Sequence, residues 1–204
     1  MSILIYLILG LLTSLLFPPY FFLPLGFIIF PLLCFLLDSN RKYNSNLNFL
    51  KNFSFFGFGF FISYLFWVKN PFFVFEETKN FFLVFLLLII LLSLILSLIF
   101  TIISKLGKNI PIILLIPFMF TISEYIISVS FYGFPWFTFS LVISSNEYLL
   151  FLLKSFGTLI SSYVIIQIFC LPFIFFKTVN LKKEIIFFLI FISLPIIFLM
   201  ISNI

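Results

Sequence analysis

Residues 80–103 read NFFLVFLLLIILLSLILSLIFTII, a stretch without a charged side chain. A helix needs about 20 mostly apolar residues to cross the hydrocarbon core of a bilayer. The stretch meets this requirement, and the first charged residues on its two sides are Lys79 and Lys105. It therefore predicts a transmembrane helix and makes the protein an integral membrane protein.

The rest of the chain is also rich in apolar residues and poor in charged ones. Hydrophobic residues make up 64% of its 204 residues and charged residues only 8%, and its mean hydropathy is +1.38. A soluble domain carries about 25% charged residues, so this chain would expose large apolar surfaces in water. We predict an all-α integral membrane protein in which residues 1–204 form a single transmembrane helical domain.

The same length criterion predicts a bundle of about seven transmembrane helices. Their approximate ranges are 2–17, 20–37, 53–68, 80–103, 110–130, 155–176 and 185–202. Pro18-Pro19 ends the first helix, because proline has no backbone N–H and clashes with the preceding turn. The first two ranges are therefore expected to pair tightly, and whether both cross fully stays open.

Basic residues predict the orientation, because they stay on the cytoplasmic side of the membrane. With the amino terminus inside, the cytoplasmic side carries Arg41, Lys42, Lys51, Lys105, Lys108, Lys177, Lys182 and Lys183, and the other side carries Lys69, Lys79 and Lys154. This asymmetry predicts the carboxyl terminus outside. The polar stretch 38–52 is expected to be a cytoplasmic connector, with contact to anionic headgroups as the alternative.

Several kinds of chemistry are excluded by the side chains available. There is no histidine, so a Ser-His triad, a Cys-His dyad and a histidine-bound metal are ruled out. Cys34 and Cys170 both lie inside apolar runs and are expected to be inert small hydrophobes. We predict no catalytic residue, metal site, cofactor or nucleic-acid partner within this sequence.

Glu124 is the clearest candidate for a functional residue, because a charged group inside a transmembrane helix is costly. Two interpretations are open. Its carboxyl group faces a cavity on the outer side, or it is buried and hydrogen-bonded to Ser123, Ser128 or Tyr125, tying helices together. Gln167 is expected to form an interhelical hydrogen bond.

The segment Gly133-Phe134-Pro135-Trp136 follows the helix that carries Glu124. Glycine permits positive φ, proline fixes the next turn, and tryptophan favours the headgroup level. The segment therefore predicts a rigid aromatic turn at the membrane surface. Trp67, at the end of the third predicted helix, is expected to be an interfacial anchor.

The run Thr121 to Tyr125, followed by Gly133-Phe134-Pro135-Trp136, resembles the membrane domain of apolipoprotein N-acyltransferase. Phe17-Pro18-Pro19-Tyr20 resembles the first turn of that family, and Gly57 to Trp67 its Gly-rich third helix. Gly157 falls where a glycine opens the sixth helix. The chain departs from the family at Ile127, where an arginine is usual, and at Phe139-Ser140, which replace a Gly-Tyr pair.

The resemblance implies a role in lipoprotein biosynthesis in the bacterial cytoplasmic (inner) membrane. In that family an acyl group passes from a phospholipid to the amino-terminal diacylglyceryl-cysteine of a lipoprotein. A nitrilase-like domain supplies the catalytic Glu, Lys and Cys. The implied site for this chain is a lipid entrance lined or shaped by Glu124, Gly133, Phe134, Pro135 and Trp136.

The sequence ends at Ile204, where the seventh helix would emerge. We therefore expect a truncated product or one half of a split enzyme, inactive alone, whose partners are membrane phospholipid, a lipoprotein substrate and a nitrilase-like domain or chain. The alternative is a small non-enzymatic membrane protein, such as a lipid carrier, a transporter or an assembly factor.

Overall fold

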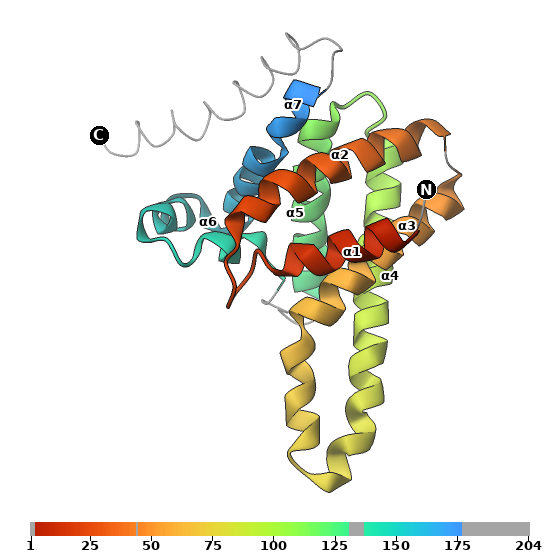
Figure 1. Ribbon diagram of the computed structural model, residues 1–204, viewed down its shortest axis with the longest axis vertical. Coiled ribbons are helices and arrows are strands. Elements are labelled where there is room, and N and C mark those ends of the chain that lie inside the picture. Colours follow the sequence, from red (N-terminus) through yellow and green to blue (C-terminus); the bar gives the residue numbers. More distant parts are fainter. Residues whose placement is uncertain (1–2, 44, 131–136, 177–204) are drawn as a thin grey trace.

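The computed structural model describes residues 3–43, 45–130 and 137–176 (Figure 1). Most of these residues are helical, and none of them forms a β-strand. The α-helices are α1 (Ile3–Ser14), α2 (Gly26–Tyr43), α3 (Asn46–Tyr64), α4 (Phe82–Leu106), α5 (Ile112–Ser130), α6 (Glu147–Cys170) and α7 (Pro172–Phe176). The 3₁₀ helices are η1 (Leu23–Leu25), η2 (Phe66–Phe73), η3 (Glu76–Phe81) and η4 (Phe139–Ile143). The predicted all-α fold class is confirmed.

The described residues contain 4 helical segments that are long and apolar enough to cross a membrane. They are Leu23–Asn40, Glu76–Leu106, Ile112–Ser130 and Leu149–Phe175. A fifth crossing results if α3 and η2, which meet at a bend of 52°, are counted as one span. The protein is therefore built to cross the membrane several times.

The predicted count of seven spans is not confirmed. Helix α1 has 12 residues, or about 18 Å at the helical rise, which is too short for the crossing predicted over 2–17. The predicted span 185–202 lies outside the described residues, and the orientation of the termini stays a prediction.

The remaining predicted ranges agree with the structure to different degrees. The ranges 80–103 and 110–130 correspond closely to α4 and α5, because continuous apolar runs define both. The range 155–176 corresponds to the second part of α6 and to α7, since α6 starts at Glu147 and is broken at Gly157. Gly157 kinks this helix with φ of 74° and ψ of −179°, a backbone conformation available only to glycine.

Helices α1 and α3 pack at unusually close range. A Cβ atom on Gly10 would lie 2.1 Å from the Phe56 carbonyl oxygen, and one on Gly59 would lie 2.3 Å from the Leu7 carbonyl oxygen. One turn further along each helix, the hydroxyl groups of Ser14 and Ser63 are 2.7 Å apart. Small residues at four-residue spacing let membrane helices approach closely, and here they hold α1 against the bundle.

A buried polar network joins α1, α2 and α3. The Asn40 amide donates to the Tyr6 hydroxyl, and the Asn52 amide donates to the Asn40 side-chain oxygen over 3.2 Å. Asn40 and Asn52 are 2% and 7% exposed. The prediction that the whole of 38–52 is a connector is therefore wrong, because α2 extends to Tyr43 and α3 begins at Asn46. Asn40 and Asn52 lie inside these two helices, where their side chains bond to each other.

Removing the middle member of this network should destabilise the protein. Asn40→Ala leaves the Tyr6 hydroxyl and the Asn52 amide without a shared partner, at a cost of about 1–3 kcal/mol. We expect a lower unfolding temperature in detergent for this variant. Asn48→Ala, on the exposed first turn of α3, should leave that temperature unchanged. Equal effects of the two substitutions would argue against the network.

An aromatic cluster fills the centre of the bundle. Phe139 is fully buried, and its ring centroid lies 4.9 Å from that of Phe120, 5.0 Å from that of Phe17 and 5.8 Å from that of Phe30. These rings come from α5, from the turn after α1 and from α2. Segment 137–143 therefore lies inside the bundle, and its position is fixed by packing on several sides.

Candidate functional site

Glu124 lies on α5 with only 3% of its surface exposed. Its carboxyl group accepts a hydrogen bond from the Thr138 hydroxyl and a second, of 3.2 Å, from the backbone N–H of Phe139. Both donors come from the segment that precedes and begins η4. The carboxyl group thus connects α5 to a chain segment that returns into the bundle.

Helix α6 completes the same cluster. The Ser162 hydroxyl accepts a hydrogen bond of 2.9 Å from the Ser140 backbone N–H and lies 3.4 Å from the Thr138 hydroxyl. The hydroxyl groups of Thr138 and Ser140 are 2.9 Å apart. Glu124, Thr138, Ser140 and Ser162 therefore form one polar cluster, which joins α5, η4 and α6. We call it the Glu124 cluster.

The cluster explains how a non-α-helical segment can lie inside a membrane protein. Backbone groups in a hydrocarbon environment need internal hydrogen-bond partners, and irregular backbone is tolerated only where protein surrounds it. The Glu124 carboxyl group and the Ser162 hydroxyl satisfy the backbone N–H groups of Phe139 and Ser140. The arrangement therefore positions this segment.

The structure decides which contacts Glu124 makes. It is buried and hydrogen-bonded, but not to the predicted neighbours. Ser123 and Ser128 donate to carbonyl oxygens of their own helix, and Tyr125 is 52% exposed. Thr138 and Ser162 were not among the predicted members of this site. A signal for them existed, because hydroxyl side chains interrupt apolar stretches at both positions.

Two departures from the family pattern have a physical explanation. Ile127 is fully buried, so an arginine would be costly at that position. Phe139 is the centre of the aromatic cluster and Ser140 belongs to the Glu124 cluster. Both residues therefore stabilise the bundle at the point where the family usually has a Gly-Tyr pair.

The predicted aromatic turn, Gly133, Phe134, Pro135 and Trp136, lies outside the described residues. The structure describes the chain again from Phe137, directly after this turn. The next residue, Thr138, belongs to the Glu124 cluster. Trp67, the predicted interfacial anchor, lies in η2 and is 50% exposed. The role of Gly133 to Trp136 at a lipid entrance and the role of Trp67 as an anchor both stay predictions.

The other polar candidates do not belong to the Glu124 cluster. Gln167 is 1% exposed, and neither polar atom of its amide has a hydrogen-bond partner within the described residues. Within the described residues, the prediction that Gln167 forms an interhelical hydrogen bond is therefore wrong. Cys34 and Cys170 are free and buried, as expected for inert thiols. In the described part of the chain, no group of three or more His, Cys, Asp or Glu side chains could hold a metal ion.

A comparison with protein families shows the family to which the chain belongs. The family model described as the apolipoprotein N-acyltransferase N-terminal domain matches residues 9–171. The chain belongs to this family. No curated protein matches the sequence. The matched range runs from α1 to the end of α6 and includes the whole Glu124 cluster, so the resemblance predicted from the Glu124 and Gly-Phe-Pro-Trp motifs is confirmed.

Membership in the apolipoprotein N-acyltransferase N-terminal domain family agrees with the apolar helices. Together they identify a multi-pass membrane protein that resembles the membrane domain of apolipoprotein N-acyltransferase. Within that domain, the Glu124 cluster fixes the chain immediately after the Gly-Phe-Pro-Trp sequence.

Proposed function

We propose that this chain is the membrane part of an apolipoprotein N-acyltransferase in the bacterial cytoplasmic membrane. Its task would be to hold a nitrilase-like catalytic domain at the outer leaflet and to admit phospholipid acyl chains from the side. The catalytic Glu, Lys and Cys would come from that domain, carried on a second chain in the split-enzyme form of the proposal. Family membership over residues 9–171 supports this assignment.

The observation that carries the site proposal is the hydrogen bonding of Glu124 to Thr138 and Phe139. These residues follow Trp136 by two and three positions. A fixed segment at that point restricts where the preceding Gly133 to Trp136 segment can lie. We propose that Glu124 positions the aromatic segment, and that the aromatic segment shapes the lipid entrance.

The role of the aromatic segment can be tested in an intact family member. The tryptophan that matches Trp136 is replaced by alanine, and lipoprotein acylation is measured by mass spectrometry of the lipoprotein amino terminus. We expect acylation to fall at least about tenfold, because misplacing a substrate by about 1 Å can cost that much. A phenylalanine variant, which keeps an aromatic ring, should lose less. Unchanged acylation in the alanine variant would remove the site assignment.

A further inference from the structure

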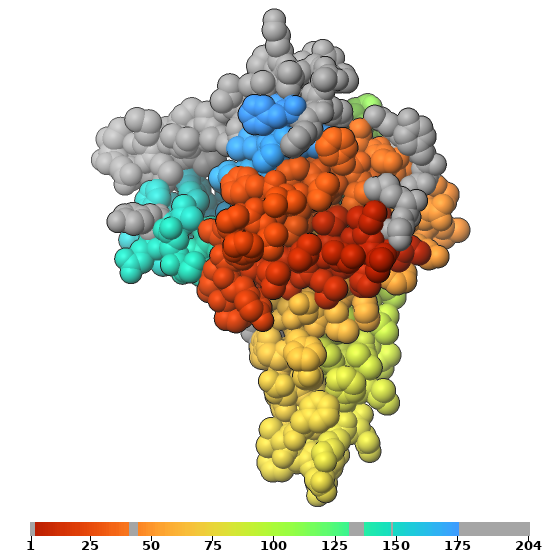
Figure 2. Space-filling model, viewed as in Figure 1, coloured from red at the N-terminus to blue at the C-terminus, as the bar shows by residue number. Residues whose placement is uncertain are grey.

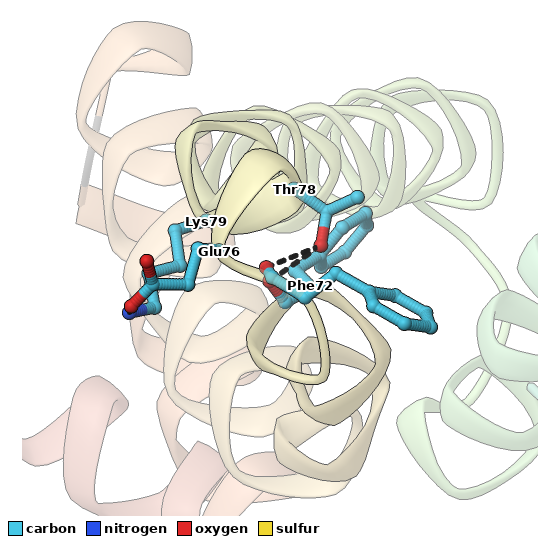
Figure 3. A network of polar contacts seen from close by, with 5 residues as sticks. Phe72, Glu76, Thr78 and Lys79 are labelled. Atoms are coloured by element: carbon cyan, nitrogen blue, oxygen red, sulfur yellow. Dashed lines mark hydrogen bonds and ion pairs between the residues drawn. The ribbon is translucent and has the colours of Figure 1, made fainter.

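Many polar side chains outside the Glu124 cluster bond close to their own position in the chain. Between η2 and η3, the Thr78 hydroxyl donates to carbonyl oxygens of its own turn over 3.0 and 2.9 Å, and Lys79 pairs with Glu76 at 3.1 Å (Figure 3). The fold itself uses these groups. Cys34 and Cys170 differ, because thiols hydrogen-bond only weakly and two thiols that meet can be joined by oxidation.

The two cysteines lie on helices that pack against each other. Figure 1 shows the orange α2 beside the blue part of α6, and in Figure 2 the surfaces of these segments adjoin. A Cβ atom on Gly26 of α2 would lie 2.6 Å from the Phe169 ring of α6. The same ring stacks on that of Phe30, with the centroids 5.6 Å apart. Helices α2 and α6 therefore approach closely at this point.

Cys34 and Cys170 face each other further along the same contact. The next ring contact joins Phe35 of α2 to Phe173 of α7, with the centroids 5.1 Å apart. Cys34 directly precedes Phe35, and Cys170 lies between Phe169 and Phe173. The two thiol groups lie close enough to affect each other electrostatically. Both residues are fully buried, and neither is in a disulfide.

The chain around Cys170 has room to adjust. Cys170 is the last residue of α6, and α7 begins at Pro172, which has no N–H to bond back into the preceding turn. The Leu171 N–H instead bonds to the Ile168 carbonyl oxygen over 3.1 Å, as in a tightened last helical turn. A disulfide requires an S–S distance of about 2.05 Å. A small shift at this helix end brings the sulfur atoms that close.

We propose that Cys34 and Cys170 form a reversible disulfide inside the membrane, which ties α2 to α6 when a neutral, lipid-soluble oxidant such as a quinone is present. Two S–H bonds break and one S–S bond forms, and the two protons and two electrons pass to the quinone, which becomes a hydroquinone. The disulfide is uncharged and suits its apolar surroundings, whereas a metal ion held by two thiolates would bury charge at a high cost. Water-soluble thiols exchange only with disulfides that they can reach, so burial shields this bond from them.

The disulfide would restrain the helix that completes the Glu124 cluster. Ser162 precedes Cys170 on α6 by eight residues, or about 12 Å at the helical rise. Holding the end of α6 against α2 therefore limits how far Ser162 can move relative to the rest of the bundle. The disulfide itself depends on the packing of α2 and α6 and not on any acyltransferase activity.

Counting free thiols in isolated membranes tests the proposal. The membranes are treated with diamide, a neutral azodicarboxamide that takes up the same two hydrogens, then dissolved in SDS and labelled with a polymer-linked maleimide. The chain has two cysteines, so we expect two labels before oxidation, none after it and two again after dithiothreitol. The oxidised chain should run as a monomer without reductant. Two labels after diamide, or a reducible dimer, would overturn the proposal.

The matched control moves one thiol to the opposite face of α2. Leu32 is 45% exposed and lies about 160° around the helix from Cys34. Leu32→Cys combined with Cys34→Ala therefore keeps two thiols, one of them easier to reach, but removes the facing pair. We expect this variant to keep both labels after diamide, and Cys34→Ala alone to keep its single label. A loss of labels equal to that of the unsubstituted chain would contradict the facing arrangement.

Thermal unfolding in detergent measures the restraint. We expect the oxidised protein to unfold at least about 4 °C above the reduced protein, because a cross-link limits the freedom of the unfolded chain. Diamide should leave the unfolding temperature of Cys34→Ala unchanged. No shift in the unsubstituted protein, despite complete disulfide formation, would contradict the proposed tie between α2 and α6.

Discussion

Gly59→Ala is expected to disrupt the packing of α1 on α3. A Cβ atom at this position would lie 2.3 Å from the Leu7 carbonyl oxygen, and a backbone oxygen can retreat only if the whole helix moves. Overpacking a rigid contact costs about 1–3 kcal/mol and sometimes more. We expect the loss to be about 3 kcal/mol or more, seen as aggregation or a strongly lowered unfolding temperature in detergent. Gly10→Ala should destabilise the protein to a similar extent, because its Cβ atom would lie 2.1 Å from the Phe56 carbonyl oxygen.

The matched control enlarges a side chain on the other face of α1. Ile8 is 44% exposed and lies about 160° around the helix from Gly10, so Ile8→Phe adds more atoms than Gly59→Ala but away from α3. It should change the free energy of unfolding by less than about 0.5 kcal/mol. If Gly59→Ala proved as harmless as Ile8→Phe, the close approach of α1 and α3 would be wrong.

Glu124→Ala is expected to have the second large effect. It removes the acceptor of the Thr138 hydroxyl and of the Phe139 N–H at a position that is only 3% exposed. Each buried donor left unpaired costs about 1–3 kcal/mol, so destabilisation of several kcal/mol is expected. Glu124→Gln keeps one side-chain oxygen and should lose less. Tyr125→Phe, on an exposed neighbour, should have little effect.

A double-mutant cycle can assign this loss to the contact itself. Glu124→Gln and Thr138→Val are measured singly and together by unfolding in detergent. Because the two side chains are hydrogen-bonded, we expect a coupling energy of about 0.5–3 kcal/mol. Strict additivity would mean that Glu124 stabilises the bundle through other partners.

The elements that could be predicted are those that a continuous stretch of the sequence defines by itself. The uninterrupted apolar runs of α4 and α5 are enough to define both helices, and Glu124 stands out as an acid in a long apolar run. The boundaries of α2 and α3 could not be predicted from composition. Asn40 reads as part of a solvated connector, but it is buried in α2 and donates to Tyr6, which lies more than thirty positions away.

The partners of Glu124 could not be predicted for a related reason. Ser123 and Tyr125 are adjacent in sequence, yet a helix directs adjacent side chains to different faces. The actual partners, the Thr138 hydroxyl and the Phe139 backbone N–H, are brought to Glu124 by the return of segment 137–143 into the bundle. That return depends on the burial of Phe139 among rings from several elements, which no local pattern reveals.

Complementation tests the proposed function most directly. The chain is co-expressed with a separate nitrilase-like domain in bacteria depleted of their own apolipoprotein N-acyltransferase, and growth and lipoprotein N-acylation are measured. We predict that both are restored by the unsubstituted chain and reduced by Glu124→Gln at equal protein abundance. No acylation by a chain that is present, folded and associated with the nitrilase-like domain would contradict the proposed function. Full acylation by the Glu124 variant would contradict the role given to the Glu124 cluster.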